Sequence, residues 1–347
     1  MATSIPTTQR AILFNKLTST LSLTTSAPVP APDSSSLIIR VHSTAITNGE
    51  LTWAPFLNWG ETHIPCYDVT GTVVALPTDS TTSHNFHIGD RVYGRIWAQR
   101  EGVACEYASI LLSEAALVPK ELDMQDAAVI PMSAHTAWQA LFEHGLLTGS
   151  FSPTSVPHVD AETGEAVLNQ ARGKRVLVLG AAGGVGILAV QMAKLAGAWV
   201  AGTAGPRNKA FLEELGVDHV IDYTKTSVKE YVQLQGNSAE AKFDLVLDCV
   251  GGEAMMDGWN GVKDHGAYIT IVPGFKEPEE GKPVGVKTKW FVMESRGEDL
   301  ERISKFFAKG MLKAAVDSVW KLEEYEKAFE KTASGHARGK VVMRVGN

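Results

Sequence analysis

Cysteine is scarce in this sequence, and its scarcity excludes two kinds of structural framework. The 347 residues include only three cysteines, Cys66, Cys105 and Cys249. They are too few and too scattered for a disulfide network or for a zinc site built from four cysteines. A compartment that keeps thiols reduced agrees with this composition.

Long apolar runs and an excess of positive charge are also missing. No stretch reaches the roughly 20 apolar residues of a transmembrane helix. Residues 1–17 contain neither the apolar core of a secretory signal nor an Arg-rich amphipathic pattern. We therefore expect a cytoplasmic protein. The net charge of −7 argues against nucleic-acid and membrane partners.

The length of the chain predicts two domains, and the sequence pattern changes near residue 124. Before it, short strand patterns separated by turns favour a small β barrel or sandwich; examples are 37–41, 69–76, 86–94 and 106–110. A single helix is expected over 124–145, followed by a polar surface loop over 150–173.

From residue 174 onward, strand patterns alternate with helical ones. The expected strands are 175–179, 199–203, 218–221, 243–250, 267–272 and 290–293. This alternation predicts a parallel, doubly wound sheet. Near the end of the chain we expect helices over 300–307 and 325–329 and a closing strand over 340–345.

A glycine-rich turn follows the first strand of this alternating region. Its sequence is Gly180-Ala181-Ala182-Gly183-Gly184-Val185-Gly186, and a helical pattern comes next. This is the dinucleotide fingerprint G-x-G-x-x-G, with Ala181 in place of the first glycine. Glycines let the backbone approach a pyrophosphate, and the helix N-terminus presents free N–H groups to it. The alternative is a strand and a helix that are merely closely packed.

The end of the second strand, residues 200–209, lacks the acidic residue that would bind the ribose hydroxyls of NAD. It carries Arg207, Asn208 and Lys209 instead. Basic groups at this place favour a 2′-phosphate, so NADP(H) is the expected cofactor. Alternatively, both basic residues simply lie on a solvated helix start.

Together with several other motifs, these residues resemble the medium-chain dehydrogenase/reductase superfamily in its zinc-free, quinone-oxidoreductase-like branch. The resemblance covers nearly the whole chain. The motifs that carry it are Gly71-Thr72-Val73-Val74, Gly89-Asp90-Arg91-Val92-Tyr93-Gly94, Glu106-Tyr107-Ala108, the segment 134–142, the glycine-rich turn, Leu215-Gly216, Val220-Ile221-Asp222-Tyr223, the segment 243–248, Val250-Gly251-Gly252 and Arg338-Gly339-Lys340-Val341-Val342.

The resemblance implies an α/β fold in which a GroES-like β-rich catalytic domain accompanies a Rossmann domain with a doubly wound parallel sheet. The GroES-like domain would comprise 1–134 and 297–347, and the Rossmann NADP-binding domain 135–296. The cofactor would lie in the cleft between the two domains. Proteins of this kind are commonly dimers or tetramers, and we expect a homodimer.

The resemblance also assigns cofactor-binding positions. They are Thr136, Gly180, Ala182, Gly183, Gly184, Val185, Thr203, Arg207, Asn208, Lys209, Tyr223, Val250, Pro273, Phe291, Val292, Met293 and Lys340. Gly183 to Val185 would hold the pyrophosphate, and Thr203, Arg207, Lys209 and Tyr223 the 2′-phosphate. For Thr136, Tyr223 and Phe291 the alternative is ordinary packing.

The ligands of catalytic zinc are missing where the resemblance would place them. Zinc enzymes of this superfamily carry a Cys in a C-x-x-[DS] segment and a His in a G-H-E segment. Here the matching segments are Thr47-Asn48-Gly49-Glu50 and Cys66-Tyr67-Asp68. Because catalytic zinc needs three good protein ligands, we expect no metal. An improvised site made of Glu50, Cys66 and His63 is the alternative.

Without a Lewis acid, conjugated carbonyl substrates are easier to reduce than simple ketones, because a developing enolate needs only hydrogen-bond donors and a proton. Tyr67 and Thr47 are the candidate catalytic residues, with water as a competitor. For Tyr67 the alternative is a packed strand residue. Residues 52–59 are rich in aromatics, which predicts an apolar small-molecule substrate, acyl or ring-like, or alternatively a packed loop.

Three functions agree with these features. The first is an NADPH-dependent oxidoreductase that reduces a quinone, enone or similar carbonyl by hydride transfer. The second is a trans-acting enoyl reductase of a polyketide or fatty-acyl pathway. The third is a non-catalytic NADPH-binding sensor or structural protein.

Overall fold

The computed structural model describes residues 5–79, 81 and 83–346, and the chain divides into two compact units. The first comprises Met1–Met132, Ser295–Lys309 and Ala314–Asn347. The second comprises Ser133–Glu294 and Gly310–Lys313. The first unit therefore takes segments from both ends of the chain.

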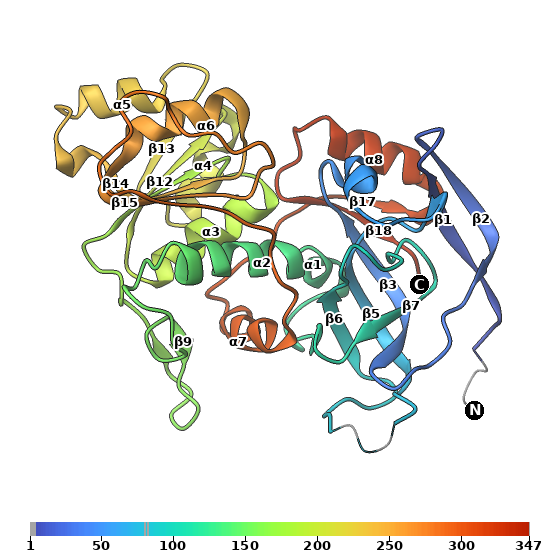
Figure 1. The fold of residues 1–347 in the computed structure, drawn as a ribbon. Coiled ribbons are helices and arrows are strands. Elements are labelled where there is room, and N and C mark those ends of the chain that lie inside the picture. The colour runs from blue at the N-terminus through green and yellow to red at the C-terminus, as the bar shows by residue number, and fades with distance from the viewer. Residues whose placement is uncertain (1–4, 80, 82, 347) are drawn as a thin grey trace. The chain divides into compact units, whose positions relative to one another are not determined.

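A six-stranded parallel sheet forms the centre of the second unit (Figure 1). Its order is β13-β12-β11-β14-β15-β16, so the chain starts in the middle and winds outward in both directions. The strands are β11 (Arg175–Leu179), β12 (Trp199–Ala204), β13 (His219–Asp222), β14 (Phe243–Asp248), β15 (Val262–Thr270) and β16 (Lys287–Trp290). The central strands β11 and β14 are almost continuously apolar because helices cover both faces of the sheet.

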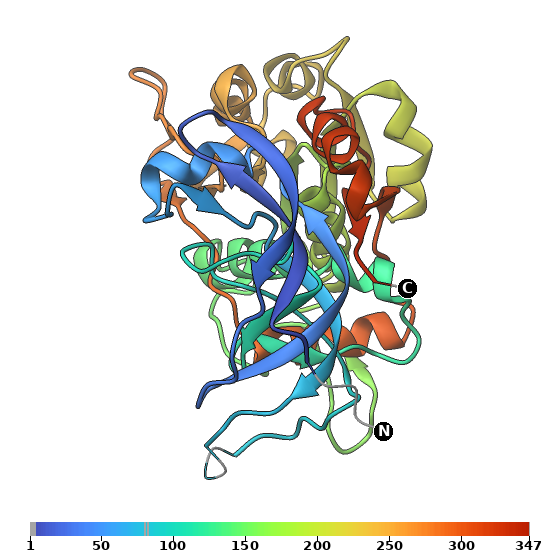
Figure 2. The same cartoon turned by 90° about the vertical axis from the view of Figure 1, so that its right-hand side faces the viewer.

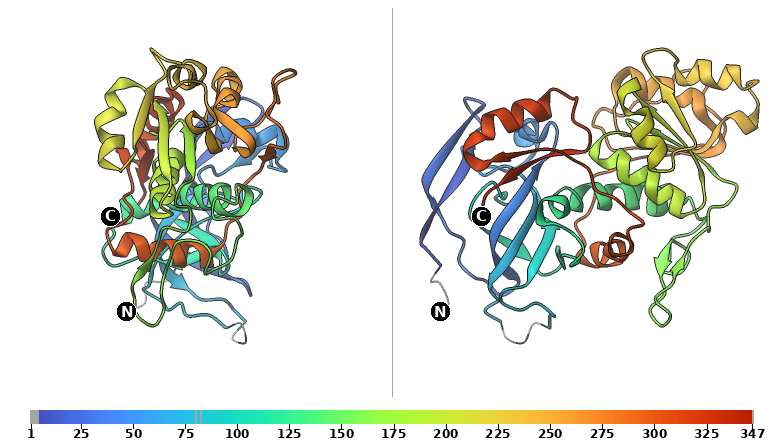
Figure 3. Two further views of the ribbon diagram at one scale, coloured as in Figure 1. Left: turned by 90° about the vertical axis from the view of Figure 1, so that its left-hand side faces the viewer. Right: turned by 180° about the vertical axis from the view of Figure 1, so that it is seen from behind.

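The helices of this unit lie on opposite faces of the sheet (Figure 3). One face carries α3 (Gly184–Leu195) and α4 (Lys209–Glu214), and the other carries α5 (Val228–Leu234) and α6 (Gly252–Gly258). Short 3₁₀ turns complete the connections: η3 (Pro206–Asn208), η4 (Ala239–Ala241) and η5 (Trp259–Gly261). The predicted doubly wound sheet is thus confirmed.

A β-rich arrangement makes up the first unit, which Figure 2 views from the side of β1 and β2. The main sheet has the order β17-β18-β3-β5-β6-β8, with β7 also paired to β3, and a smaller sheet has the order β2-β1-β4. The strands are β1 (Thr8–Asn15), β2 (Thr20–Pro28), β3 (Ser36–Ile46), β4 (Thr62–His63), β5 (Asp68–Ala75), β6 (Arg91–Arg95), β7 (Tyr107–Leu111), β8 (Ala115–Leu117), β17 (Val316–Lys321) and β18 (Lys340–Arg344).

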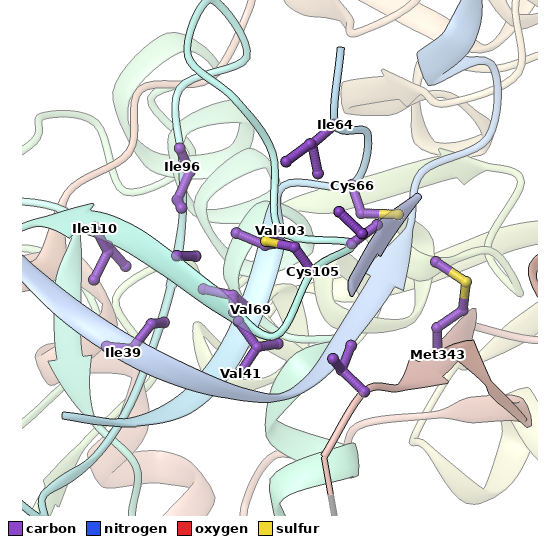
Figure 4. Packing of buried hydrophobic residues seen from close by; sticks show 14 of the residues in the cluster. Ile39, Val41, Ile64, Cys66, Val69, Ile96, Val103, Cys105, Ile110 and Met343 are labelled. Atoms are coloured by element: carbon purple, nitrogen blue, oxygen red, sulfur yellow. The ribbon is translucent and has the colours of Figure 1, made fainter. Parts of the chain in front are cut away.

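Helical elements of the first unit are few. They are η1 (Glu50–Phe56), α1 (Met124–Ala128), α7 (Gly297–Ala308), η6 (Leu322–Glu324) and α8 (Tyr325–Ala333). The core lies within the β-rich arrangement, and Figure 4 shows Ile39, Val69 and Met343 converging there with Cys66 and Cys105. Both cysteines are buried and form no disulfide, so they pack in the core as small apolar side chains do.

Three local expectations differ from the structure. The single helix over 124–145 is divided into α1, α2 (Pro131–Trp138) and a π-helical turn, η2 (Gln139–His144), because Pro131 has no N–H with which to continue α1. The last strand of the parallel sheet ends at Trp290 rather than covering 290–293. The loop over 150–173 contains a small hairpin of β9 (His158–Val159) and β10 (Ala166–Val167).

Candidate functional site

The glycine-rich turn connects β11 to α3 in the second unit. Gly180 has a φ of 77°, a left-handed conformation that a side chain would strain. Its N–H donates to Thr203 Oγ1 at 2.9 Å, and the N–H of Ala181 donates to the Thr203 carbonyl at 3.0 Å. Thr203 therefore holds the turn from the neighbouring strand β12. Its role at the 2′-phosphate stays a prediction.

Gly183 and Gly186 lack side chains for different reasons. A Cβ on Gly186 would lie 2.3 Å from the Gly180 carbonyl oxygen and 2.7 Å from Ala181 Cα, so the close packing of α3 on the turn requires this glycine. A Cβ on Gly183 would meet only the Gly180 carbonyl oxygen, at 3.4 Å. Gly183 has a φ of −80° and a ψ of 170°, which any residue adopts. The described residues therefore leave open space beside Gly183, which is what a phosphate-binding turn needs.

Ala181 stands where the fingerprint has its first glycine, and β12 makes room for the extra methyl group. A Cβ on Gly202 would lie 2.5 Å from the Cβ of Ala181. The position that must lack a side chain is therefore Gly202, on the adjacent strand, rather than residue 181 in the turn. The turn still packs tightly against β12. Ala182, Gly184 and Val185 continue the turn into α3.

Basic and aromatic residues lie at the carboxyl ends of β12 and β13. Arg207 is exposed in η3, beside Asn208, and Lys209 begins α4, where it lies 3.8 Å from Glu213. A Cβ on Gly205 would lie 3.4 Å from Tyr223 Oη, so the tyrosine hydroxyl reaches the end of β12. Tyr223 is 66% exposed, which does not agree with a packing role.

The end of β14 is held by a buried carboxylate that the sequence did not single out as functional. Asp248 accepts the N–H groups of Val250 and Gly251, both at 2.9 Å, and the hydroxyl of Thr270. Val250 is half exposed and adjoins the glycine turn, since a Cβ on Gly180 would lie 2.8 Å from Val250 Cγ2. The sequence signal that could have pointed to Asp248 is an acidic residue in an otherwise apolar strand.

The remaining predicted cofactor residues of this unit vary in exposure. Pro273 follows β15 and is exposed, and Val292 is 55% exposed after β16. Met293 and Thr136 are buried. Phe291 is also buried and contacts the ring of His144 at 4.3 Å, which agrees with the packing alternative.

In the first unit, side chains from five segments meet in what we call the polar cluster. Its members are Thr47, Glu50, Cys66, Asp68, Met132 and Lys340. Glu50 is 1% exposed, and its two carboxylate oxygens accept the N–H groups of Thr47, at 2.8 Å, and Cys66, at 2.9 Å. Burial raises the pKa of Glu50 to about 7, although these hydrogen bonds and Lys340 oppose the shift.

Lys340 forms a buried ion pair in this cluster. Its ammonium group donates to the carboxylate of Asp68 and, at 3.1 Å, to Thr47 Oγ1. The other Asp68 oxygen accepts the N–H of Met132 at 2.7 Å. The Thr47 hydroxyl donates to the thioether sulfur of Met132 at 3.2 Å. The structure therefore places the predicted residues Thr47 and Lys340 together, in the first unit.

The second catalytic candidate, Tyr67, lies among aromatic rings. Its hydroxyl lies 3.0 Å from His63 Nε2, and His63 Nδ1 lies 3.5 Å from a carboxylate oxygen of Glu101. Trp59 stacks on His63 at 4.1 Å between ring centroids, and Trp53 stacks on Tyr67 at 5.8 Å. Burial raises the pKa of Tyr67 and lowers that of His63 to about 4. In the segment 52–59, Trp53, Leu57 and Trp59 are thus packed, as the alternative had it, whereas Phe56 is 85% exposed.

The alternative metal site does not form. His63 points to Tyr67 and Glu101, while both oxygens of Glu50 accept backbone N–H groups. Burial, with Glu50 nearby, raises the pKa of the Cys66 thiol, which disfavours a thiolate ligand. Within residues 5–79, 81 and 83–346, no group of three or more His, Cys, Asp or Glu side chains could hold a metal ion.

Comparison with known proteins identifies the family. The model of a zinc-binding dehydrogenase family matches residues 215–343. A probable zinc-binding oxidoreductase, named as mitochondrial, from Arthroderma benhamiae is 38% identical over 99% of this chain and 98% of its own length. A quinone oxidoreductase, named as chloroplastic, from Triphysaria versicolor is 30% identical over 91% of this chain and 92% of its own. This chain belongs to the medium-chain dehydrogenase/reductase superfamily.

The fold comparison agrees with this assignment. A quinone oxidoreductase from Coxiella burnetii has a TM-score of 0.76 and 24% identity, covering 98% of this chain and all of that one. The fold class and the prediction of a quinone-oxidoreductase-like oxidoreductase are confirmed. A relative named as an NAD(P)H oxidoreductase agrees with the expected pyridine nucleotide.

The expectation of a cytoplasmic protein is contradicted. The Arthroderma relative is named as mitochondrial, and so is an NAD(P)H oxidoreductase from Danio rerio that is 30% identical over 80% of this chain and 71% of its own length. A small number of cysteines does not distinguish one reducing compartment from another, so composition could not decide this point. Within the part of the chain that the structure describes, no helix is long and apolar enough to cross a membrane.

Proposed function

We propose that this chain is an NADPH-dependent reductase that works without zinc and passes hydride to a quinone, an enone or a similar conjugated carbonyl. The observation that carries the proposal is the unfilled space at Gly183, beside a strand end with two basic residues and no acid. The turn supplies backbone N–H groups and the N-terminus of α3 for a pyrophosphate.

The preference for NADPH rests on the end of β12. Arg207 and Lys209 are exposed there, and the Tyr223 hydroxyl reaches Gly205. Two cations and a hydroxyl suit a 2′-phosphate, whereas the carboxylate that would bind the ribose hydroxyls of NAD is missing from 200–209.

The proposal of zinc-free chemistry rests on the donor set. Thr47 and Tyr67 present hydroxyls where zinc enzymes have a thiolate and an imidazole, and hydroxyls are poor ligands for zinc. The nearby Cys66 is fully buried in the core, with a raised pKa. A conjugated substrate suits such a site because hydride addition to its far end leaves an enolate, which hydrogen-bond donors stabilise.

Thr47 is the hydroxyl best prepared to stabilise that enolate. Lys340 donates to its oxygen and so makes the hydroxyl a stronger donor, while its own hydrogen rests on the Met132 sulfur, a weak acceptor. A bound nicotinamide would supply the hydride. Thr47 holds its proton at Oγ1, where an enolate oxygen would be a better acceptor than sulfur. Tyr67 is completely buried and its hydroxyl already contacts His63, so we place it second.

The double variant Arg207→Gln/Lys209→Gln tests the proposal. With a quinone or enone as acceptor, we expect kcat/KM for NADPH to fall at least about tenfold, because hydrogen bonds to a charged phosphate are lost, and that for NADH to change little. Lys229→Gln, an exposed lysine on α5, is the matched control. An equal loss with both cofactors would contradict the NADPH assignment, and activity that a chelator abolishes and zinc restores would contradict zinc-free chemistry.

A further inference from the structure

Arg95, at the end of β6, is a buried guanidinium that the mechanism above does not use. The side chain is 2% exposed. Its one hydrogen bond among the described residues runs from Nη1 to Ser295 Oγ at 3.5 Å, the upper limit for such a bond, and its Nε has no partner there. A guanidinium has five N–H donors, so most of this group's capacity is unused. Burying a charge in this way is costly unless something pairs with it.

The neighbouring carboxylates do not pair with Arg95. Asp68 lies directly opposite it on β5, but the two Asp68 oxygens accept from Met132 and Lys340. Glu114 accepts from Arg100 and from the N–H groups of Trp97 and Leu111.

Glu50 likewise accepts from the N–H groups of Thr47 and Cys66. Burial lowers the pKa of Arg95, and the fields of Asp68 and Glu114 offset this only in part. The nearby carboxylates therefore stabilise the positive charge of Arg95 electrostatically, but they accept no hydrogen bond from it.

Two aromatic rings and one small hydroxyl surround the guanidinium. Its central carbon lies 6.0 Å from the centroid of Tyr67 and 5.2 Å from that of Trp97, which is 37% exposed. Two aromatic rings thus lie beside the planar fork, and Ser295 adds one further polar group. This set suits a carboxylate, whose two oxygens match a guanidinium fork. Inorganic phosphate is the competing anion, since a guanidinium also binds phosphate oxygens.

We propose that Arg95 is the binding site for a carboxylate of the substrate, so that the preferred substrates are conjugated carbonyl compounds that carry an acid group. This inference rests on the proposed reductase function and adds the substrate class to it. The pairing of β5 with β6 supports this proposal, because Arg95 lies opposite Asp68. The Asp68 carboxylate binds Lys340, which also contacts Thr47.

A matched pair of substrates tests the proposal by kinetics. β-Acetylacrylate is an enone with a carboxylate, and its methyl ester lacks the charge. In wild type we expect kcat/KM with NADPH to favour the acid, and Arg95→Met to reduce the ratio of acid to ester by roughly tenfold to a hundredfold, the usual effect of a hydrogen bond to a charged group. Reduction of the ester should persist. If the ratio stays the same in Arg95→Met while both compounds are reduced, the carboxylate site is refuted and the reductase function stands.

A binding measurement tests the same site without turnover. Levulinate, the saturated analogue, should raise the unfolding temperature of wild type but not of Arg95→Met, and inorganic phosphate should raise neither. Without ligand, Arg95→Met should unfold at the same or a higher temperature, since an unpaired buried charge has been removed. Arg40→Met, an exposed arginine on β3, is the control.

Two outcomes of this measurement would overturn the proposal. One is an Arg95→Met variant that is clearly less stable together with a wild type that does not respond to levulinate, which would make Arg95 a structural residue. The other is a response to phosphate equal to that to levulinate. Arg95→Lys, which keeps the charge but loses the planar fork, should retain only part of the response to levulinate.

Discussion

The glycine turn of the second unit and the polar cluster of the first are prepared for chemistry in opposite ways. At the turn, the functional feature is a missing side chain, because Gly183 leaves space that nothing else in the described protein fills. In the polar cluster, the proposed functional features are buried ionisable side chains: Lys340 pairs with Asp68, and Glu50 accepts two backbone N–H groups. The open space at the turn hardly affects the stability of the fold, whereas the polar cluster buries charged groups away from water.

This difference teaches where a substitution should be harmful and why. Adding an atom at the turn affects the ligand or the packing, depending on which glycine receives it. Removing a charge from the cluster leaves its partner buried without compensation, which is among the most destabilising changes a protein can undergo.

The largest expected effect comes from breaking the ion pair in the cluster. Lys340→Met leaves the Asp68 carboxylate, which is fully buried, without its cation, and should lower the free energy of unfolding by about 3–5 kcal/mol. The double variant Asp68→Asn/Lys340→Met removes both charges and should recover much of the loss. Urea unfolding of both variants measures this. A double variant as unstable as the single one would show that packing, rather than unpaired charge, is responsible.

Glu50 should make the stability of the protein depend on pH. Its pKa is raised from 4.5 to about 7, so between these values the unfolded chain has lost the proton that the folded protein keeps. Stability therefore falls as pH rises from about 4.5 to 7, by up to about 3 kcal/mol from this group, and levels off above. Glu50→Gln should flatten this part of the profile in unfolding measured at several pH values.

Glu165, which is exposed, provides the control for this experiment, because Glu165→Gln should leave the profile unchanged. An equal pH slope in wild type and in Glu50→Gln would mean that the two backbone N–H groups keep the buried carboxylate ionised throughout the range.

The smallest changes in stability are expected at the turn, where substitutions of Gly183 and Gly186 should have different effects. Gly186→Ala places a Cβ 2.3 Å from a backbone oxygen and should destabilise the fold by about 1–3 kcal/mol. Gly183→Ala meets no such contact and should unfold at nearly the wild-type temperature. NADPH should nevertheless no longer stabilise it, whereas wild type should gain about 2.7 kcal/mol at a hundredfold excess of ligand over Kd. If Gly183→Ala responds to NADPH as wild type does, the turn does not bind the phosphates.

The sequence predicted the second unit in detail because its signals are local. The strand Arg175–Leu179 has the bounds that its apolar run predicts, and the glycine spacing beyond it marks the turn into α3. The helix expected over 124–145 was wrong, because its apolar periodicity continues through Pro131, which breaks the backbone hydrogen bonding. In the first unit, the strand β17 was missed, since its residues are mostly half-buried and show no clear alternation.

In the first unit, several strands and helices were predicted, among them 37–41, 69–76 and 106–110, but not the contacts between them. Thr47 and Tyr67 were named because the zinc ligands of the superfamily are absent there, and Lys340 because of its tail motif. Nothing in the sequence indicated that Lys340 lies against Asp68, 272 residues earlier. The sequence also gave no reason to separate Arg95 from Arg91, an exposed residue on the same strand.

The sequence by itself determined the alternating strands and helices, the dinucleotide turn, the basic strand end and the absence of the usual zinc ligands. These are properties of neighbouring residues, and backbone geometry converts them directly into structure. The tertiary structure alone decided which charges are buried, which of them are paired, and that Arg95 Nε has no partner among the described residues. Burial and pairing depend on segments brought together by the packing of the whole sheet, and those contacts determine both the pKa of Glu50 and the unused donors of Arg95.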